Sequence, residues 1–441
     1  MGEGNEQYLA QMRFGRTACA IVGLWMWCAV VWLPSGLEAQ RGGMFQGSAD
    51  DPAIAYSTAP VSNAVEQLNR RLQDGSAGLT FAGRSGYLQS AIEALRLPID
   101  SQLLVFSKAS LQGRLVNPSN PRALFFDDRV VLAWVRDGEL LEAAAHDQNG
   151  SVVFYSLEQR PAARPMFKRE FRCLGCHMTG DTLGVPGLLM FSTTADASDR
   201  PVMVTTDHRS PLAERWGGWF VTGNSGAAQH LGNEVPAIEG QARLSLASAS
   251  GLFEADGFRG TSSDIAALMT FSHQTQMVNL LTRASWEARA ADPAQHPAVL
   301  ASPAQMALVE THMRGVAEEV VDYMLFVDEA RLLSPVAGRS GFAERMSAGG
   351  PRDRHGRSLY ELDLKRRLMK YSCSYLIYSP AFDALPPLAK EPIYRRLWHV
   401  LAGEAGEPRY RSLSLTDRQA IVEILRDTKP ELPAYFAAVT R

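Results

Sequence analysis

The sequence has few cysteines and no excess of charge of either sign. Five cysteines in 441 residues are too few for a disulfide-framed secreted protein. The 44 basic and 47 acidic residues give a formal net charge of −3, which argues against a general attraction to nucleic acid or anionic lipid. The signatures H-E-x-x-H, G-x-S-x-G, G-x-G-x-x-G and the P-loop are all missing. These absences leave a globular protein with no familiar catalytic motif.

Long hydrophobic runs are also scarce. One uncharged run, residues 18–33, approaches membrane length, and Arg13 and Arg16 precede it. The run is short for a membrane-spanning helix and is followed by Leu37-Glu38-Ala39, a cleavage-type end. We therefore predict a secretory signal peptide over residues 1–39, with a periplasmic or otherwise exported mature chain. The alternative is an uncleaved N-terminal anchor; apart from it, we expect no integral membrane domain. Translation could also start at Met12.

The predicted secondary structure changes along the chain. Short β-type runs at residues 103–106, 130–135 and 152–157 are punctuated by the turn signals 136–138 and 148–150. Further β-type runs lie at residues 187–192, 202–206 and 219–222. From residue 262 onward the pattern is mostly helical. We predict an α+β fold, with a β-rich domain over residues 40–255 and a helical domain over residues 256–441.

Several helices carry terminal signals. Ser302-Pro303 predicts the start of a helix that extends to about Phe326, and residues 416–419 form a capping-box pattern before another helix. Residues 262–290 read as a helix with Ser262 or Ser263 as its N-cap. In the first half, residues 61–73 and 87–97 have helical spacing, whereas residues 40–60 are rich in Gly, Ser and Ala and predict a loose leader.

One motif carries chemistry: Cys173 and Cys176, followed at once by His177. In this C-x-x-C-H spacing, two thiols on one turn can form thioethers with the two vinyl groups of a haem. The imidazole of the next residue then lies beneath the iron as the proximal ligand. Combined with export, the motif predicts one covalently attached haem c, with His177 as a metal ligand.

Two other interpretations of the motif fit less well. A thioredoxin-like redox pair would follow a strand and begin a helix, but Pro161, Pro165 and basic residues precede this motif. A zinc site needs about four ligands, and Cys373 is the only further thiol of the mature chain. We expect Cys373 to be a buried free thiol, because its neighbours are apolar.

On Cys173, Cys176 and His177, and on these alone, the chain resembles the c-type cytochromes. The resemblance implies haem binding and one-electron transfer with a redox partner protein that the sequence does not identify. The motif lies deep in the chain among β-type sequence, so we do not expect the small all-α cytochrome c fold. The alternative is a haem c-dependent oxidoreductase, a peroxidase or oxygenase with an open sixth iron position. A haem-based sensor is a third class.

A second unusual stretch is residues 205–219, which contains Trp216-Gly217-Gly218-Trp219. It could form a haem wall in which Arg209 or Arg215 pairs with a haem propionate. The simpler interpretation, which we favour, is a turn with aromatic packing and a surface arginine.

The sixth iron ligand is the least determined feature of the sequence. His273 is the best candidate, because it falls in an apolar stripe with Ile265, Met269, Met277 and Leu281 at i, i+4 spacing. Its simpler interpretation is a hydrogen-bonded core histidine. Met277, His208 and His230 follow as candidates, as does an open position.

Overall fold

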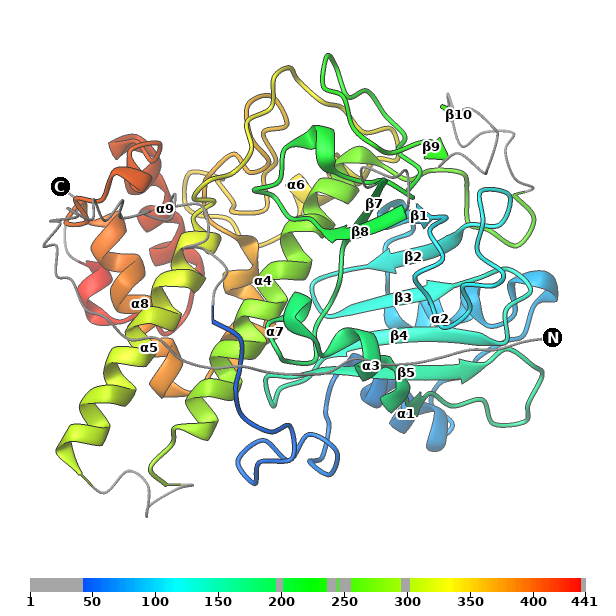
Figure 1. Cartoon of the computed structure of the whole chain (residues 1–441), viewed down its shortest axis with the longest axis horizontal. Coiled ribbons are helices and arrows are strands. Elements are labelled where there is room, and N and C mark those ends of the chain that lie inside the picture. Colours follow the sequence, from blue (N-terminus) through cyan, green and yellow to red (C-terminus); the bar gives the residue numbers. More distant parts are fainter. Residues whose placement is uncertain (1–42, 196–200, 236–243, 246–254, 295–301, 438–441) are drawn as a thin grey trace, which may run out of the picture. The chain divides into compact units, whose positions relative to one another are not determined.

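The computed structural model describes residues 43–195, 201–235, 244–245, 255–294 and 302–437 (Figure 1). The predicted signal peptide and its cleavage site at Ala39 lie outside the described residues. Residues 43–60 are not the loose leader that their composition predicts. Phe45 and Tyr56 are buried against Trp286, with ring centroids 5.3 and 6.0 Å from the indole.

A six-stranded antiparallel sheet forms the first half, and its strands follow one another in chain order. The strands are β1 (Leu103–Val105), β2 (Arg122–Phe126), β3 (Val130–Trp134), β4 (Leu140–His146), β5 (Val152–Glu158) and β6 (Lys168–Arg169). The β-type runs at 103–106, 130–135 and 152–157 are confirmed, and the turn signals connect β3 to β4 and β4 to β5. Asp137 and Gly150 have φ angles of +60° and +70° in these turns, as tight hairpin connections require.

Both faces of the sheet are buried, and alternate residues of each strand enter different cores. Ala123, Phe125 and Leu132 pack with α1 (Ala64–Gln73) and α2 (Leu88–Leu95). Leu124 and Phe126 face the opposite way and pack with the helices of the second half. The sheet is therefore the middle layer between two sets of helices.

The second half is helical, so the α+β prediction is confirmed. Its helices are α4 (Ile265–Ala290), α5 (Pro303–Met324), α6 (Phe342–Ala348), α7 (Pro380–Asp383), α8 (Pro387–Leu401) and α9 (Leu415–Thr428). Helix α5 packs between α4 and α8 (Figure 1). Residues on both sides of the boundary expected near residue 255 belong to one hydrophobic cluster, because the sheet and the helices share a core.

The helix caps agree in part with those predicted from the sequence. Ser302 and Gln305 form the capping box of α5, with Pro303 in the first turn, as predicted. The N-cap of α9 is Ser414 rather than Thr416. The N-cap of α4 is Asp264, not Ser262 or Ser263. Helix α4 is also buried on nearly every side rather than along one stripe, because it lies between the sheet and the other helices.

The middle of the chain forms smaller elements. Strands β7 (Phe191–Ala195) and β8 (Pro201–Thr205) make a hairpin, and β9 (Glu234–Val235) pairs with β10 (Leu244–Ser245). The strand predicted at 219–222 is absent: Trp219 and Thr222 make only isolated bridges, to Val105 and Asp264.

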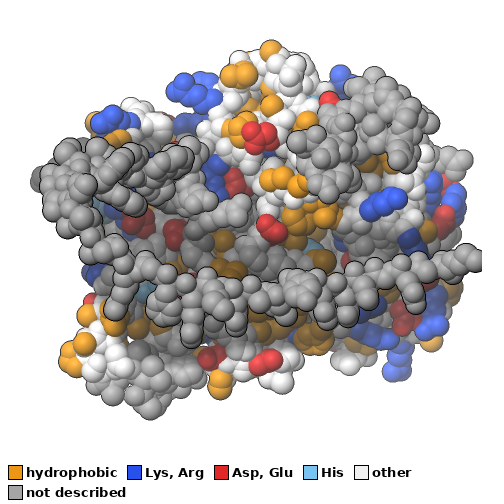
Figure 2. Space-filling view, in the orientation of Figure 1, with side chains coloured by type: hydrophobic (Ala, Val, Ile, Leu, Met, Phe, Trp, Pro, Cys, Tyr) orange, Lys and Arg blue, Asp and Glu red, His pale blue; other side chains and the backbone are white. Residues whose placement is uncertain are grey.

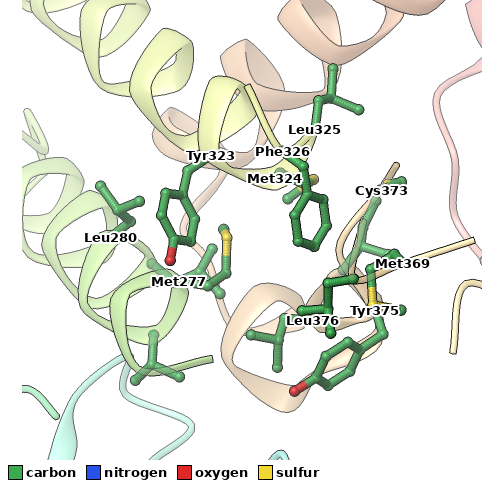
Figure 3. Packing of buried hydrophobic residues seen from close by; sticks show 14 of the residues in the cluster. Met277, Leu280, Tyr323, Met324, Leu325, Phe326, Met369, Cys373, Tyr375 and Leu376 are labelled. Carbon is green, nitrogen blue, oxygen red and sulfur yellow. The ribbon is translucent and has the colours of Figure 1, made fainter. Parts of the chain in front are cut away.

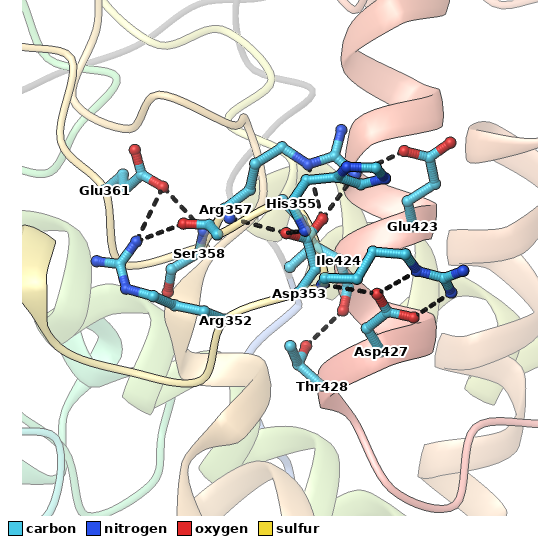
Figure 4. Close-up of polar contacts among 12 residues, drawn as sticks. Arg352, Asp353, His355, Arg357, Ser358, Glu361, Glu423, Ile424, Asp427 and Thr428 are labelled. Carbon is cyan, nitrogen blue, oxygen red and sulfur yellow. Dashed lines mark hydrogen bonds and ion pairs between the residues drawn. The ribbon is translucent and has the colours of Figure 1, made fainter.

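The loop that follows α6 is held to α9 by charged side chains (Figure 4). The buried carboxylate of Asp353 accepts hydrogen bonds from the backbone and side chain of Arg357, which also pairs with Glu423 of α9 at 2.5 Å. Arg354 pairs with Asp427 one turn along the same helix. These contacts fix the loop to α9. Elsewhere, acidic and basic side chains are interspersed on the face shown in Figure 2.

Among the described residues, no helix combines the length and the apolar character needed to cross a membrane.

The backbone at position 217 lies so close to the backbone of Thr193 that only glycine fits there. A Cβ atom at this position would lie 2.0 Å from the carbonyl oxygen of Thr193. We expect Gly217→Ala to lower the free energy of unfolding by about 2 kcal/mol, because the backbone of the hairpin would have to move. Gly315→Ala, in an exposed and unobstructed position of α5, should instead stabilise by up to about 1 kcal/mol. Denaturant unfolding of both variants tests this, and equal effects would contradict it.

Candidate functional site

The C-x-x-C-H motif folds as one short helical turn. The 3-10 helix η3 (Phe171–Cys173) leads directly into α3 (Leu174–His177), and the side chain of Glu170 caps η3 by accepting from the Arg172 N–H at 3.2 Å. Because residues three apart share one side of a helical turn, Cys173 and Cys176 present their thiols together. Both thiols are free, Cys176 is exposed and Cys173 is partly buried. The turn can therefore offer two thiols to one ligand.

His177 has a defined orientation. Its Nδ1 lies 2.8 Å from the carbonyl oxygen of Gly187, and a carbonyl only accepts, so Nδ1 carries the proton and Nε2 keeps its lone pair. The Phe154 ring of β5 lies 4.8 Å from the imidazole, centroid to centroid. Burial lowers the pKa of His177, which keeps the ring neutral at physiological pH. A neutral imidazole with one nitrogen fixed by a carbonyl is the form that binds a metal.

Asn279 of α4 holds the segment that orients His177. The Asn279 amide accepts from the Leu188 N–H at 2.8 Å and donates to the Leu188 carbonyl at 2.9 Å. Next to it, the Gly187 N–H donates to the His177 carbonyl at 2.8 Å. A Cβ atom on Gly187 would lie 2.4 Å from the Asn279 side-chain oxygen. Asn279 thus positions His177 through Leu188 and Gly187. Asn279 and Leu188 are 91 residues apart, so no local sequence signal reveals this contact.

The environment of Cys173 keeps its thiol protonated. Burial, with the carboxylates of Glu142 and Glu170 nearby, raises the pKa of Cys173 to about 12, although Arg122 and Arg172 oppose the effect. Reactive redox cysteines are thiolates of lowered pKa. Cys173 therefore does not resemble a reactive redox cysteine.

His273, the leading candidate for the sixth iron ligand, has both ring nitrogens engaged by protein side chains. Its Nε2 lies 2.7 Å from the Ser374 hydroxyl and its Nδ1 lies 2.8 Å from Nδ1 of His208. The ring also stacks on Tyr323 and Phe326, at centroid distances of 5.2 and 4.3 Å. Both nitrogens have protein partners within the core, which makes His273 a hydrogen-bonded core histidine.

The other candidates are also placed. Met277 is fully buried and lies beside Tyr323 in the core formed by α4, α5 and residues 369–376 (Figure 3). His208 is buried, and its Nε2 has no hydrogen-bond partner, but Tyr323 and Phe326 enclose the ring at 4.1 and 4.8 Å. His230 is a loop residue 5.6 Å from the Trp216 ring.

The stretch 205–219 follows its simpler interpretation. Arg215 is buried and donates to the backbone carbonyls of Ser210 and His208, both at 2.7 Å. Arg209 pairs with Asp207. Trp216 and Trp219 are buried. Both arginines therefore hold their own loop together. Arg209, whose side chain is 38% exposed and lies over the Tyr323 ring, is the surface arginine expected from the sequence, whereas Arg215 is buried.

Cys373 is a buried free thiol, as predicted. Burial raises its pKa to about 12. It is therefore inert at neutral pH.

No protein-family model, curated protein or solved structure matches this chain. Within the described ranges, no group of three or more His, Cys, Asp or Glu side chains is arranged to hold a metal ion. The function is therefore argued from the motif turn and its surroundings.

Proposed function

We propose that this chain is an exported monohaem c-type cytochrome that passes single electrons. The observation that carries the proposal is the C-x-x-C-H turn: two free thiols on one side, and His177 fixed through Nδ1 so that Nε2 keeps its lone pair. A spectroscopic haem assay of the chain, exported by a cell with a haem c maturation system, should give one haem per chain. That haem should resist acid-acetone extraction. A colourless protein, or haem that is extracted, would contradict the proposal.

Each residue of the turn has a distinct role in this function. Cys173 and Cys176 tether the haem so that it is not lost outside the cytoplasm, and His177 supplies the proximal ligand through Nε2. The haem iron, when bound, exchanges one electron between its ferrous and ferric states. The Gly187 carbonyl and Asn279 keep the imidazole in one orientation. Little then has to move on electron transfer.

A haem oxidoreductase with an open sixth position is the second candidate. Its support is the placement of His273 and Met277, which are engaged in core packing rather than directed at an iron. The spectrum of the oxidised protein separates the two functions. Low-spin, six-coordinate iron supports electron transfer, whereas high-spin iron that binds CO or peroxide supports the enzyme.

We expect His273→Ala to leave the iron spin state unchanged. The substitution removes two buried hydrogen bonds and an aromatic stack, so it should lower the free energy of unfolding by about 3 kcal/mol without altering the iron ligands. Absorption and EPR spectra of the oxidised protein measure the spin state, and thermal unfolding measures the stability.

His177→Ala is the comparison for His273→Ala in the same spectra, because it removes the proposed iron ligand. It should change the iron spectrum while the thioethers still hold the haem. If His273→Ala instead converts low-spin iron to high-spin iron, the placement of His273 in the haem-loaded protein differs from the one described here.

A further inference from the structure

An ion pair lies within the apolar face of the sheet. Arg122 of β2 pairs with Glu142 of β4, and their side chains are only 19% and 10% exposed. Arg122 donates to one oxygen of Glu142 through a terminal nitrogen, whereas Arg122 Nε and Glu142 Oε1 are buried without a hydrogen-bond partner among the described residues. Buried polar atoms are nearly always paired, and a buried ion pair is costly unless its remaining donors and acceptors are satisfied. The unused Nε–H of Arg122 therefore points to a ligand that accepts a hydrogen bond.

This pair lies beside the motif turn. Glu142 is directly opposite Ser156 on β5, and the Ser156 hydroxyl lies 3.4 Å from the Glu170 carboxylate, which caps the turn. Two residues along β4, Ala144 is opposite Phe154, whose ring packs on His177. The two charges also act on the motif itself. Glu142 raises the pKa of both Cys173 and His177, and Arg122 lowers both.

Two other arginines near the motif also make hydrogen bonds. Arg172 donates to Glu170 through Nε and a terminal nitrogen, at 2.8 and 2.6 Å. Arg169 donates to the backbone carbonyl of Tyr56 at 2.6 Å. Arg169 and Arg122 both keep a buried Nε–H without a partner in the described part of the chain, but only Arg122 of the two acts electrostatically on both Cys173 and His177. A guanidinium donor of this kind matches a carboxylate.

We propose that the Arg122–Glu142 pair anchors the haem: Arg122 donates its unused Nε–H to one haem propionate, and Glu142 holds the guanidinium in place. This inference rests on the proposed function. It assigns Arg122 as a haem-binding residue and Glu142 as a positioning residue. It also has an electrostatic consequence. A nearby cation disfavours the ferric state and a nearby anion favours it, so the two side chains act on the midpoint potential with opposite signs.

The test compares Arg122→Gln with Glu142→Gln in the exported, haem-loaded chain. Arg122→Gln should lower the midpoint potential and shift the propionate bands of the resonance Raman spectrum. Glu142→Gln should raise the potential, and the double variant should fall between the two. Arg122→Lys and Glu142→Asp retain the charges and should stay closer to the wild-type potential, which covers the case in which a glutamine variant does not fold.

The control is the exposed pair Arg114–Glu139, 3.1 Å apart with side chains 75% and 80% exposed. Arg114→Gln and Glu139→Gln should leave the potential and the propionate bands unchanged. Shifts at Arg122 and Glu142 that are no larger than those of the control, or that have the same sign, would overturn the inference. A wild-type chain without covalent haem would refute the proposed function instead.

Discussion

Replacing Cys173 and Cys176 together with alanine is expected to abolish covalent haem, from one haem per chain to none. The thioethers are the only covalent attachment that the motif provides, and each thiol is free in the described structure. Haem-stained denaturing gels of the exported protein measure the loss. Acid-acetone extraction should remove any haem that still associates without a covalent bond.

Cys373→Ala is the matched control, because it removes the third thiol of the described residues and leaves the motif intact. It should keep one covalent haem per chain. The small cavity that it creates should cost about 1 kcal/mol of stability. Retention of covalent haem in the Cys173 and Cys176 double variant would contradict the assignment of these thiols.

The second large effect is a loss of stability on replacing Asp264, the N-cap of α4, with alanine. This fully buried carboxylate accepts from Ala266 N–H at 2.8 Å, and its other oxygen accepts from Arg339 and Ser340 N–H at 2.6 and 2.8 Å. Asp264→Ala would leave these donors buried and unpaired. We expect the free energy of unfolding to fall by about 3 kcal/mol or more, as measured by urea denaturation.

Ser414→Ala provides the comparison, because Ser414 caps α9 at an exposed position through the Asp417 N–H. Water can replace that hydrogen bond, so the cost should be about 1 kcal/mol. If Asp264→Ala costs no more than Ser414→Ala, the carboxylate does not join α4 to residues 339–340 in the way described.

The sequence by itself determined the features that depend on near neighbours. Short β-type runs and two turn signals placed β1, β3 and β5, because apolar residues that favour strands are local and tight turns need positive φ angles. The start of α5 at Ser302-Pro303 was also predicted from the sequence, because the hydrogen bonds of an N-cap are made within one helical turn. The spacing of Cys173, Cys176 and His177 likewise placed these residues on one turn.

Only the tertiary structure decided what each buried polar group contacts. The helix stripe placed His273 in the core, but its partners are Ser374 and His208, 101 and 65 residues away. Asn279 reaches Leu188 across 91 residues, and Arg122 meets Glu142 across the intervening strand β3. Periodicity tells which side of an element is buried, whereas the partner of a buried donor or acceptor is set by the element that packs against it. Which element packs at that position is decided only when the whole core forms.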